Sequence, residues 1–102
     1  MQELLQKHHD EIVRLCRTYG VRRLVVFGSA LRSDFDASRS DIDFLVEFEP
    51  ASASERVQRY LALQKDLDAL LARPIDLIEN GAIRNPYVLE SVAASQQTLY
   101  AA

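Results

Sequence analysis

Apolar residues recur at helical spacing in two long segments of the chain, and each segment ends at a residue that stops helices. The first segment precedes Gly20 and has apolar positions at Leu4, Leu5, Ile12, Leu15, Cys16 and Tyr19. The second opens with a capping box formed by Ser52 and Glu55 and ends before Pro74. Its apolar stripe is Val57, Tyr60, Leu61, Leu67, Leu70 and Leu71. The spacing predicts a helix in each segment.

Shorter segments predict β-strands. "RRLVVF" (22–27) is a β-branched and aromatic run, whereas "DIDFLVEF" (41–48) and "PIDLIE" (74–79) alternate. In the second of these strands Ile42, Phe44, Val46 and Phe48 share one face, and Asp41, Asp43, Leu45 and Glu47 share the other. "QTLY" (97–100) is compatible with a last edge strand.

The remaining segments predict loops and two further helices. "SALR" (29–32) is expected to start a short helix, and the polar residues 32–40 are expected to form a loop. Asn85 and Pro86 suit the N-cap and first position of a final helix to about residue 94. The resulting order predicts one domain over residues 1–102, of α/β or α+β class, with a small mixed sheet and flanking helices.

Composition narrows the class of protein. The 102 residues are 48% hydrophobic and 26% charged, which suits one folded domain. A net charge of −3 argues against a general nucleic-acid binder, so no direct DNA binding is expected. We expect no membrane association, since the sequence has neither a long apolar run nor a signal-peptide pattern. The single cysteine, Cys16, excludes an internal disulfide and suits a reducing cytoplasm, where we expect the protein to reside.

Three aspartates in apolar strand segments are the first candidate chemistry. Asp41 and Asp43 share a face of their strand, and Asp76 faces the same way if its strand is a neighbour. Three carboxylates on one side of a sheet repel one another unless cations neutralise them. Hard divalent cations, Mg²⁺ above all, bind such oxygen ligands, and two such ions can clamp a phosphoryl-type transfer. The pattern predicts a Mg²⁺ site with room for two ions.

The Gly28-Ser29 pair is the second candidate. It stands between a predicted strand and a predicted helix start, where free backbone N–H groups attract an anion. The Ser29 hydroxyl adds a donor for a phosphate oxygen. The GxxxxGK[ST] spacing of a P-loop is absent, so this would be a different kind of phosphate cradle.

"GSALR", then "SDIDFLVEF", and later "PIDLIE" together resemble the minimal nucleotidyltransferase family of the DNA polymerase β-like superfamily. More narrowly, they resemble the antitoxin partners of HEPN-domain ribonuclease toxins. The likeness is clearest over residues 21–79. One position departs from the family pattern, because Ser33 stands where the family often has glycine.

The resemblance implies a polymerase β-like core and a role for each matching residue. Asp41 and Asp43 would hold two Mg²⁺ ions, and Asp76 would share one ion and accept the proton of the nucleophile. The resemblance also implies that Gly28 and Ser29 bind the nucleotide phosphates. Arg32 and Arg39 are further candidates, because guanidinium suits bidentate contact with phosphate, although either could equally be a solvated loop charge. Ser40 is a candidate beside them. The implied reaction transfers AMP from ATP to a tyrosine hydroxyl of a cognate HEPN toxin, in a complex of the two proteins, and so silences the toxin.

Two other functions remain open at this point. The chain could be an antitoxin that inhibits its partner by binding alone. It could also transfer a nucleotide to a small molecule, although it has little room for a dedicated small-molecule pocket. Taken singly, a Gly-Ser turn or an Asp-x-Asp strand is more often structural, and only their combination with Asp76 favours catalysis.

Overall fold

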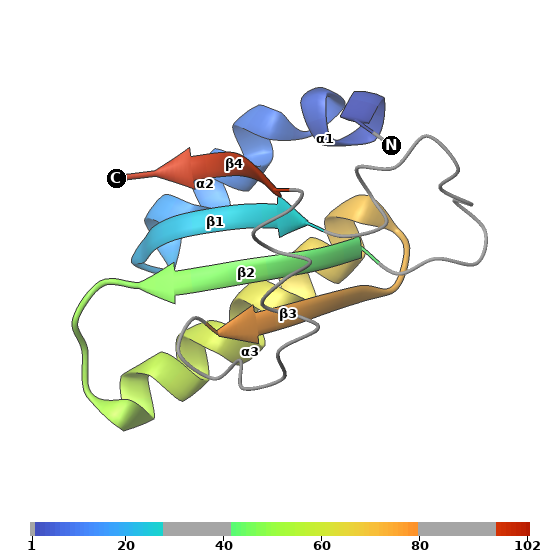
Figure 1. Ribbon diagram of the computed structural model, residues 1–102. Coiled ribbons are helices and arrows are strands. Elements are labelled where there is room, and N and C mark those ends of the chain that lie inside the picture. The colour runs from blue at the N-terminus through green and yellow to red at the C-terminus, as the bar shows by residue number, and fades with distance from the viewer. Residues whose placement is uncertain (1, 28–41, 80–95) are drawn as a thin grey trace, which may run out of the picture.

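The computed structural model describes residues 2–27, 42–79 and 96–102 (Figure 1). Its helices and strands are α1 (Gln2–Lys7), α2 (His9–Thr18), β1 (Val21–Phe27), β2 (Ile42–Phe48), α3 (Ala53–Leu71), β3 (Ile75–Glu79) and β4 (Gln96–Ala101). The short helix expected near residue 29, the loop at 32–40 and the final helix expected at 85–94 lie outside the described residues.

The described strands form one mixed sheet in the order β3-β2-β1-β4. β1 is antiparallel to both β2 and β4, whereas β2 and β3 are parallel. A parallel pair needs a crossover, and α3 supplies it between β2 and β3. The predicted α+β class with a small mixed sheet is therefore confirmed, and the expected C-terminal edge strand is β4.

The helices cover one face of this sheet, and the hydrophobic core lies between them (Figure 1). The alternation predicted for β2 is confirmed, because every second residue from Ile42 to Phe48 is buried. The buried residues of the core are Leu5, Ile12, Cys16, Val21, Leu24, Val26, Ile42, Phe44, Val46, Phe48, Leu63, Leu67, Leu71, Leu77 and Leu99. Asp43 therefore points to the face that the helices leave uncovered.

The N-terminal segment differs from its prediction, because it forms two helices instead of one. His8 separates them with φ −103° and ψ 11°, outside α-helical geometry. Hydrogen bonds span the kink: the N–H of His8 donates to the Leu4 carbonyl at 3.2 Å, and that of Ile12 donates to the His8 carbonyl at 2.9 Å. Leu5 and Ile12 consequently contact the same core. The predicted stop holds, since Gly20 follows α2 with φ +66°.

α3 begins as predicted, and its buried stripe agrees with the prediction in part. The Ser52 side chain accepts a hydrogen bond from the N–H of Glu55 at 3.2 Å. The buried positions are Leu63, Leu67 and Leu71, whereas two members of the predicted stripe, Val57 and Leu61, are 57% and 59% exposed. Leu61 is six residues from Leu67, which places it about 120° around the helix and beyond the buried face. The predicted stripe was therefore wrong at these two positions.

None of the helices in the described ranges is both long enough and apolar enough to cross a membrane.

Candidate active site

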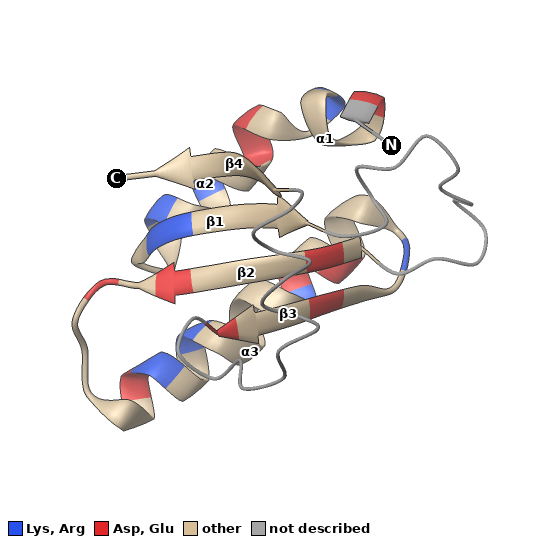
Figure 2. Cartoon of the chain, viewed as in Figure 1, with Lys and Arg blue, Asp and Glu red and all other residues tan. Residues whose placement is uncertain are grey.

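Asp43 and Asp76, two of the three predicted carboxylates, are direct partners in the parallel pairing of β2 with β3. Both belong to the face opposite the core, where Asp43 is half-buried and Asp76 is exposed. Figure 2 shows the acidic positions on neighbouring stretches of the two strands. The condition set by the sequence, that Asp76 must lie on a neighbouring strand, is met in the described structure.

Paired positions on one face of neighbouring strands are close enough for both side chains to reach one divalent cation. Neighbouring strands lie about 4.8 Å apart, and Mg²⁺ binds carboxylate oxygens at about 2.1 Å. Side chains from paired positions on one face can therefore ligate the same ion. Within the described ranges no three His, Cys, Asp or Glu side chains come together as a metal site, and the expected third ligand, Asp41, lies outside those ranges.

An apolar row borders the carboxylates on the same face. Leu45 of β2 pairs with Val25 of β1 on one side and with Ile78 of β3 on the other. Leu45 and Ile78 follow Asp43 and Asp76 by two residues on their strands. Val25 is buried, and the other two are half-buried. Charges interact more strongly next to an apolar surface than in open water. A cation held between the aspartates would therefore be attracted to them more strongly.

The other predicted site residues are Gly28, Ser29, Arg32, Arg39, Ser40 and Asp41, and all of them lie outside the described residues. Their flanking positions are described. β1 ends at Phe27, which pairs with Asp43, and β2 begins at Ile42. The described chain therefore reaches the carboxylates directly before Gly28 and resumes there directly after Asp41.

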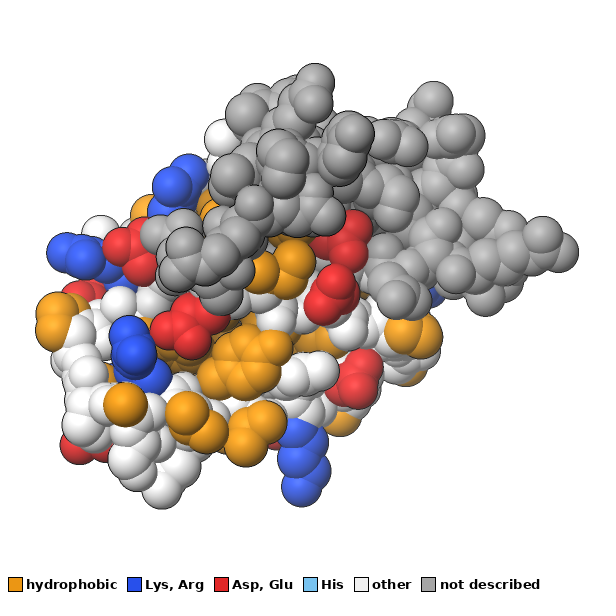
Figure 3. All heavy atoms as spheres, turned by 60° about the horizontal axis from the view of Figure 1, so that its bottom comes forward, with side chains coloured by type: hydrophobic (Ala, Val, Ile, Leu, Met, Phe, Trp, Pro, Cys, Tyr) orange, Lys and Arg blue, Asp and Glu red, His pale blue; other side chains and the backbone are white. Residues whose placement is uncertain are grey.

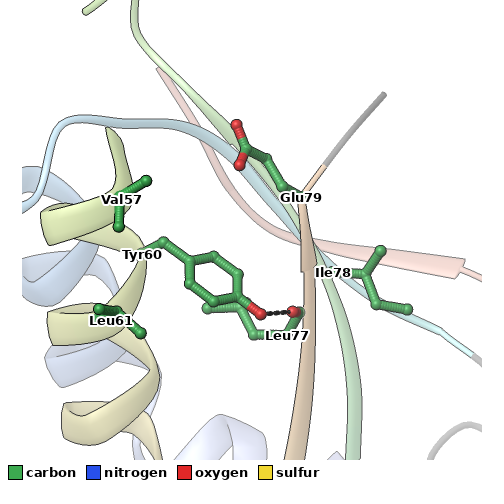
Figure 4. A pocket seen from close by; sticks show the side chains of 6 residues that line it. All are labelled: Val57, Tyr60, Leu61, Leu77, Ile78 and Glu79. Carbon is green, nitrogen blue, oxygen red and sulfur yellow. Dashed lines mark hydrogen bonds between the residues drawn. The ribbon is translucent and has the colours of Figure 1, made fainter. Parts of the chain in front are cut away.

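Tyr60 of α3 is hydrogen-bonded to β3, which its sequence pattern did not indicate. It packs against the core as predicted, and its hydroxyl donates a hydrogen bond to the Leu77 carbonyl of β3 (Figure 4). Burial, followed by the negative charges of Asp76 and Glu79, raises the pKa of the Tyr60 phenol. The negative charge of Asp76 therefore acts on this phenol.

Arg73 is a nearby cation that the sequence reasoning overlooked. It is half-buried at the approach to β3, three residues before Asp76. Pro74 follows Arg73, and its carbonyl accepts a hydrogen bond from the N–H of Ile42 at 3.2 Å. The approach to β3 therefore lies beside the start of β2. The only sequence signal was a basic residue directly before "PID".

Comparison with known proteins gives a consistent result. The profile of a family described as nucleotidyltransferase domain matches residues 9–97. A Methanocaldococcus jannaschii protein, named as a candidate protein adenylyltransferase, is 36% identical over 93 residues, which cover 90% of this chain and 87% of that protein. A second protein of the same organism with the same description is 34% identical over 92 residues, with the same shares of both chains.

Solved structures with the same fold include a protein described as a candidate minimal nucleotidyltransferase. It has a TM-score of 0.66 and 28% identity, and the match covers 93% of this chain and 92% of that one. A toxin–antitoxin complex with AMP-PNP contains a chain with a TM-score of 0.68 and 19% identity, covering 92% and 73%. A complex of a tri-AMPylated Shewanella oneidensis HEPN toxin with its MNT antitoxin gives 0.56 and 20%, covering 95% and 72%. At these lower identities the last two show likeness of fold.

Proposed function

Because the chain belongs to the nucleotidyltransferase domain family, we propose that it is an antitoxin that transfers AMP from ATP to a tyrosine hydroxyl of a HEPN-domain toxin. The observation that carries this proposal is the pairing of Asp43 with Asp76 on the uncovered face of the sheet. The names of the relatives support a protein acceptor, and two neighbours of the same fold come from toxin–antitoxin complexes.

Mg²⁺ fits the aspartates that the structure brings together, and Asp41, Asp43 and Asp76 would hold it. When bound, it would neutralise the negative charge that develops on the reacting phosphate. Gly28 and Ser29 would bind the phosphates of ATP through backbone N–H groups and a hydroxyl.

Three further residues of the proposed nucleotide site are polar or basic. Arg32 and Arg39 suit bidentate contact with the triphosphate, and Ser40 would add a hydroxyl donor beside them. Together with the Gly28-Ser29 pair they would orient the α-phosphorus toward the acceptor.

The proposed transfer has a simple atom balance. The tyrosine oxygen of the acceptor attacks the α-phosphorus of ATP, and the bond from that phosphorus to the bridging oxygen of pyrophosphate breaks. Asp76, the exposed member of the pair, accepts the proton of the hydroxyl. The products are the AMP-modified acceptor and pyrophosphate.

The test is intact-mass spectrometry of the protein that the neighbouring gene encodes, which the proposal expects to have a HEPN domain, after incubation with this chain, ATP and Mg²⁺. We expect one or more AMP additions with the wild-type chain, and peptide mapping should locate them on tyrosine. Asp43→Asn and Asp76→Asn should abolish the addition, as should chelation of the metal. Glu47→Gln is the matched control, since Glu47 is a carboxylate on the same face of β2 as Asp43.

Inhibition of the toxin by all versions of the chain, without any mass gain, would show an antitoxin that acts by binding. Mass gain on a small-molecule acceptor alone would show a different transferase. Either result would contradict the proposal.

A further inference from the structure

An open groove of about 490 Å³ runs between α3 and β3. It is lined by Val57, Tyr60, Leu61, Leu77, Ile78 and Glu79, which come from the helix and from the edge strand (Figure 4). Figure 3, turned to bring this side forward, shows hydrophobic side chains gathered there beside acidic ones. We call this feature the α3/β3 groove.

The apolar wall of the α3/β3 groove is not part of the core. Val57 and Leu61 are 57% and 59% exposed, and they are the large hydrophobic side chains that stand out in this way among the described residues. Positions 57 and 61 are one turn apart on α3, so they form a continuous strip. Exposed apolar side chains that line a groove together are typical of a binding surface, whereas single ones are ordinary.

The groove is continuous with the proposed site, because β3 contributes to both. Ile78 lines the groove and shares its strand face with Asp76, two residues away. Tyr60 forms the floor, and the negative charges of Asp76 and Glu79 both act on its phenol. A polypeptide lying in the groove would contact Ile78. It would therefore lie beside β3 two residues from Asp76, the carboxylate proposed to accept the proton.

The charges around the groove specify a complementary occupant. Asp76 and Glu79 stand on the β3 side. Arg56 of α3 is paired with Glu79 at 3.7 Å, so Asp76 is the main source of negative charge on this side among the described residues. No ion pair joins Asp76 to another described residue. A segment with apolar side chains toward α3 and a basic side chain toward β3 would satisfy both walls.

We propose that the α3/β3 groove is the docking surface for the protein acceptor, and that its occupant is an amphipathic segment with apolar and basic side chains. This inference rests on the proposed function, since it assigns the acceptor of that same site. Docking here would hold the acceptor across the edge of β3 and bring its hydroxyl toward Asp76.

The variant Val57→Thr/Leu61→Gln tests this assignment, because it makes the exposed strip polar without changing charge. Ser54→Gln/Gln58→Thr is the matched control, since both residues are exposed on the same helix, lie outside the groove and gain the same two side chains. Circular dichroism and thermal unfolding would first establish that both variants fold. Two measurements then follow: the Kd of the HEPN-domain protein without ATP, and the KM and kcat of AMP transfer to it.

The expected result is a rise of about tenfold or more in acceptor Kd and KM for the groove variant, because two apolar anchors are removed. Its kcat at saturating acceptor and its Kd for ATP should match those of the control. Acceptor binding equal to wild type would overturn the docking proposal and leave the proposed function intact. Weakened ATP binding would instead make the groove a nucleotide pocket, and dissociation of a dimer of this chain would make it a self-association surface. Both outcomes overturn the proposal.

Failure of the proposed function gives a different signature. A wild-type chain that binds the HEPN-domain protein but never modifies it would refute AMP transfer. The docking proposal would then be tested by the Kd of the HEPN-domain protein for the groove variant and its control. A wild-type chain that does not bind this protein would refute the docking proposal.

Discussion

Asp43 and Asp76 are paired side by side on parallel strands, and their carboxylates face the side of the sheet that the helices do not cover. Like charges at directly paired positions destabilise a sheet. The fold places two acidic side chains side by side at the position where the proposed activity needs ligands. Such local conflicts are expected at functional sites, where the sequence serves binding at the expense of stability.

Replacing Asp76 by asparagine should stabilise the protein when divalent cations are absent. The expected gain is about 0.2–1 kcal/mol, because the variant removes one of two paired like charges and solvent screens the exposed carboxylate. Thermal unfolding in a chelator measures this gain. Glu47→Gln is the contrasting variant, since Arg22 is paired with Glu47 at 3.4 Å and its removal should not stabilise the protein. Mg²⁺ should stabilise the wild type and have little effect on the variant, since a ligand stabilises only the state that binds it. A lower Tm for Asp76→Asn in chelator would contradict this account.

Tyr60→Phe should lower stability by about 0.5–1.5 kcal/mol at neutral pH, because the hydroxyl no longer donates to the Leu77 carbonyl. The pKa of Tyr60 is raised above 10.0 in the folded state, first by burial and then by Asp76 and Glu79. The folded state therefore keeps the phenol proton to a higher pH than the unfolded state. This contribution is fully present below pH 10 and is lost as pH rises through the folded-state pKa.

Urea denaturation at several values of pH checks both statements. Wild type should lose stability more steeply than Tyr60→Phe above pH 10, so the difference between the two proteins should shrink there. Tyr19, whose pKa is raised first by its hydrogen bond to Asp66, is present in both proteins and cancels in the comparison. A difference that stays constant with pH would show that Tyr60 has the same pKa in both states.

Periodicity predicted which face of β2 is buried, but it could not reveal which strands are neighbours. The alternation of β2 follows from burial of one face, so Asp43 could be assigned to the other face from sequence alone. The pairing of Asp43 with Asp76 also depends on β3 lying beside β2, and this is set by the crossover through α3. The same limit explains the two wrong positions of the α3 stripe, because tertiary packing leaves Val57 and Leu61 beyond the sheet's edge strand.

Sequence signals that depend on one or two specific side chains predicted the ends of helices correctly. The capping pair Ser52 and Glu55 and the stop at Gly20 both hold in the structure. The kink at His8 had no such signal, since neither proline nor glycine marks it. The Gly28-Ser29 pair and Asp41 remain predictions, because they lie outside the described residues.

Cys16 should be inert toward thiol reagents in the folded protein. Its side chain is fully buried in the core, and burial raises its pKa to about 12. Labelling requires a thiolate that the reagent can reach, so it should proceed through unfolding. Labelling at pH 8 should be about 10³-fold slower than in denaturant, or slower still. Rapid stoichiometric labelling of the native protein would show that the α2 side of the core opens locally.

Ala72→Gly should stabilise the protein by about 0.5–1 kcal/mol. Ala72 follows α3 with φ 54°, in the left-handed region, where a Cβ is strained by about 1–2 kcal/mol. Glycine relieves that strain, and its greater freedom in the unfolded chain offsets part of the gain. Because Ala72 is exposed, the substitution removes no core contact. The midpoint of urea denaturation should rise while the m-value stays the same.

Gly20→Ala is the reverse experiment at the end of α2, and it should destabilise by about 1–2 kcal/mol. Gly20 has φ +66°, and a Cβ there would lie 3.0 Å from the Arg59 guanidinium. Adding Arg59→Ala should relieve the crowding but not the backbone strain, so the double variant should recover only part of the loss. Full recovery would show that side-chain contact, and not the left-handed backbone, sets the requirement for glycine. Destabilisation by Ala72→Gly would show that chain entropy outweighs strain at the end of α3.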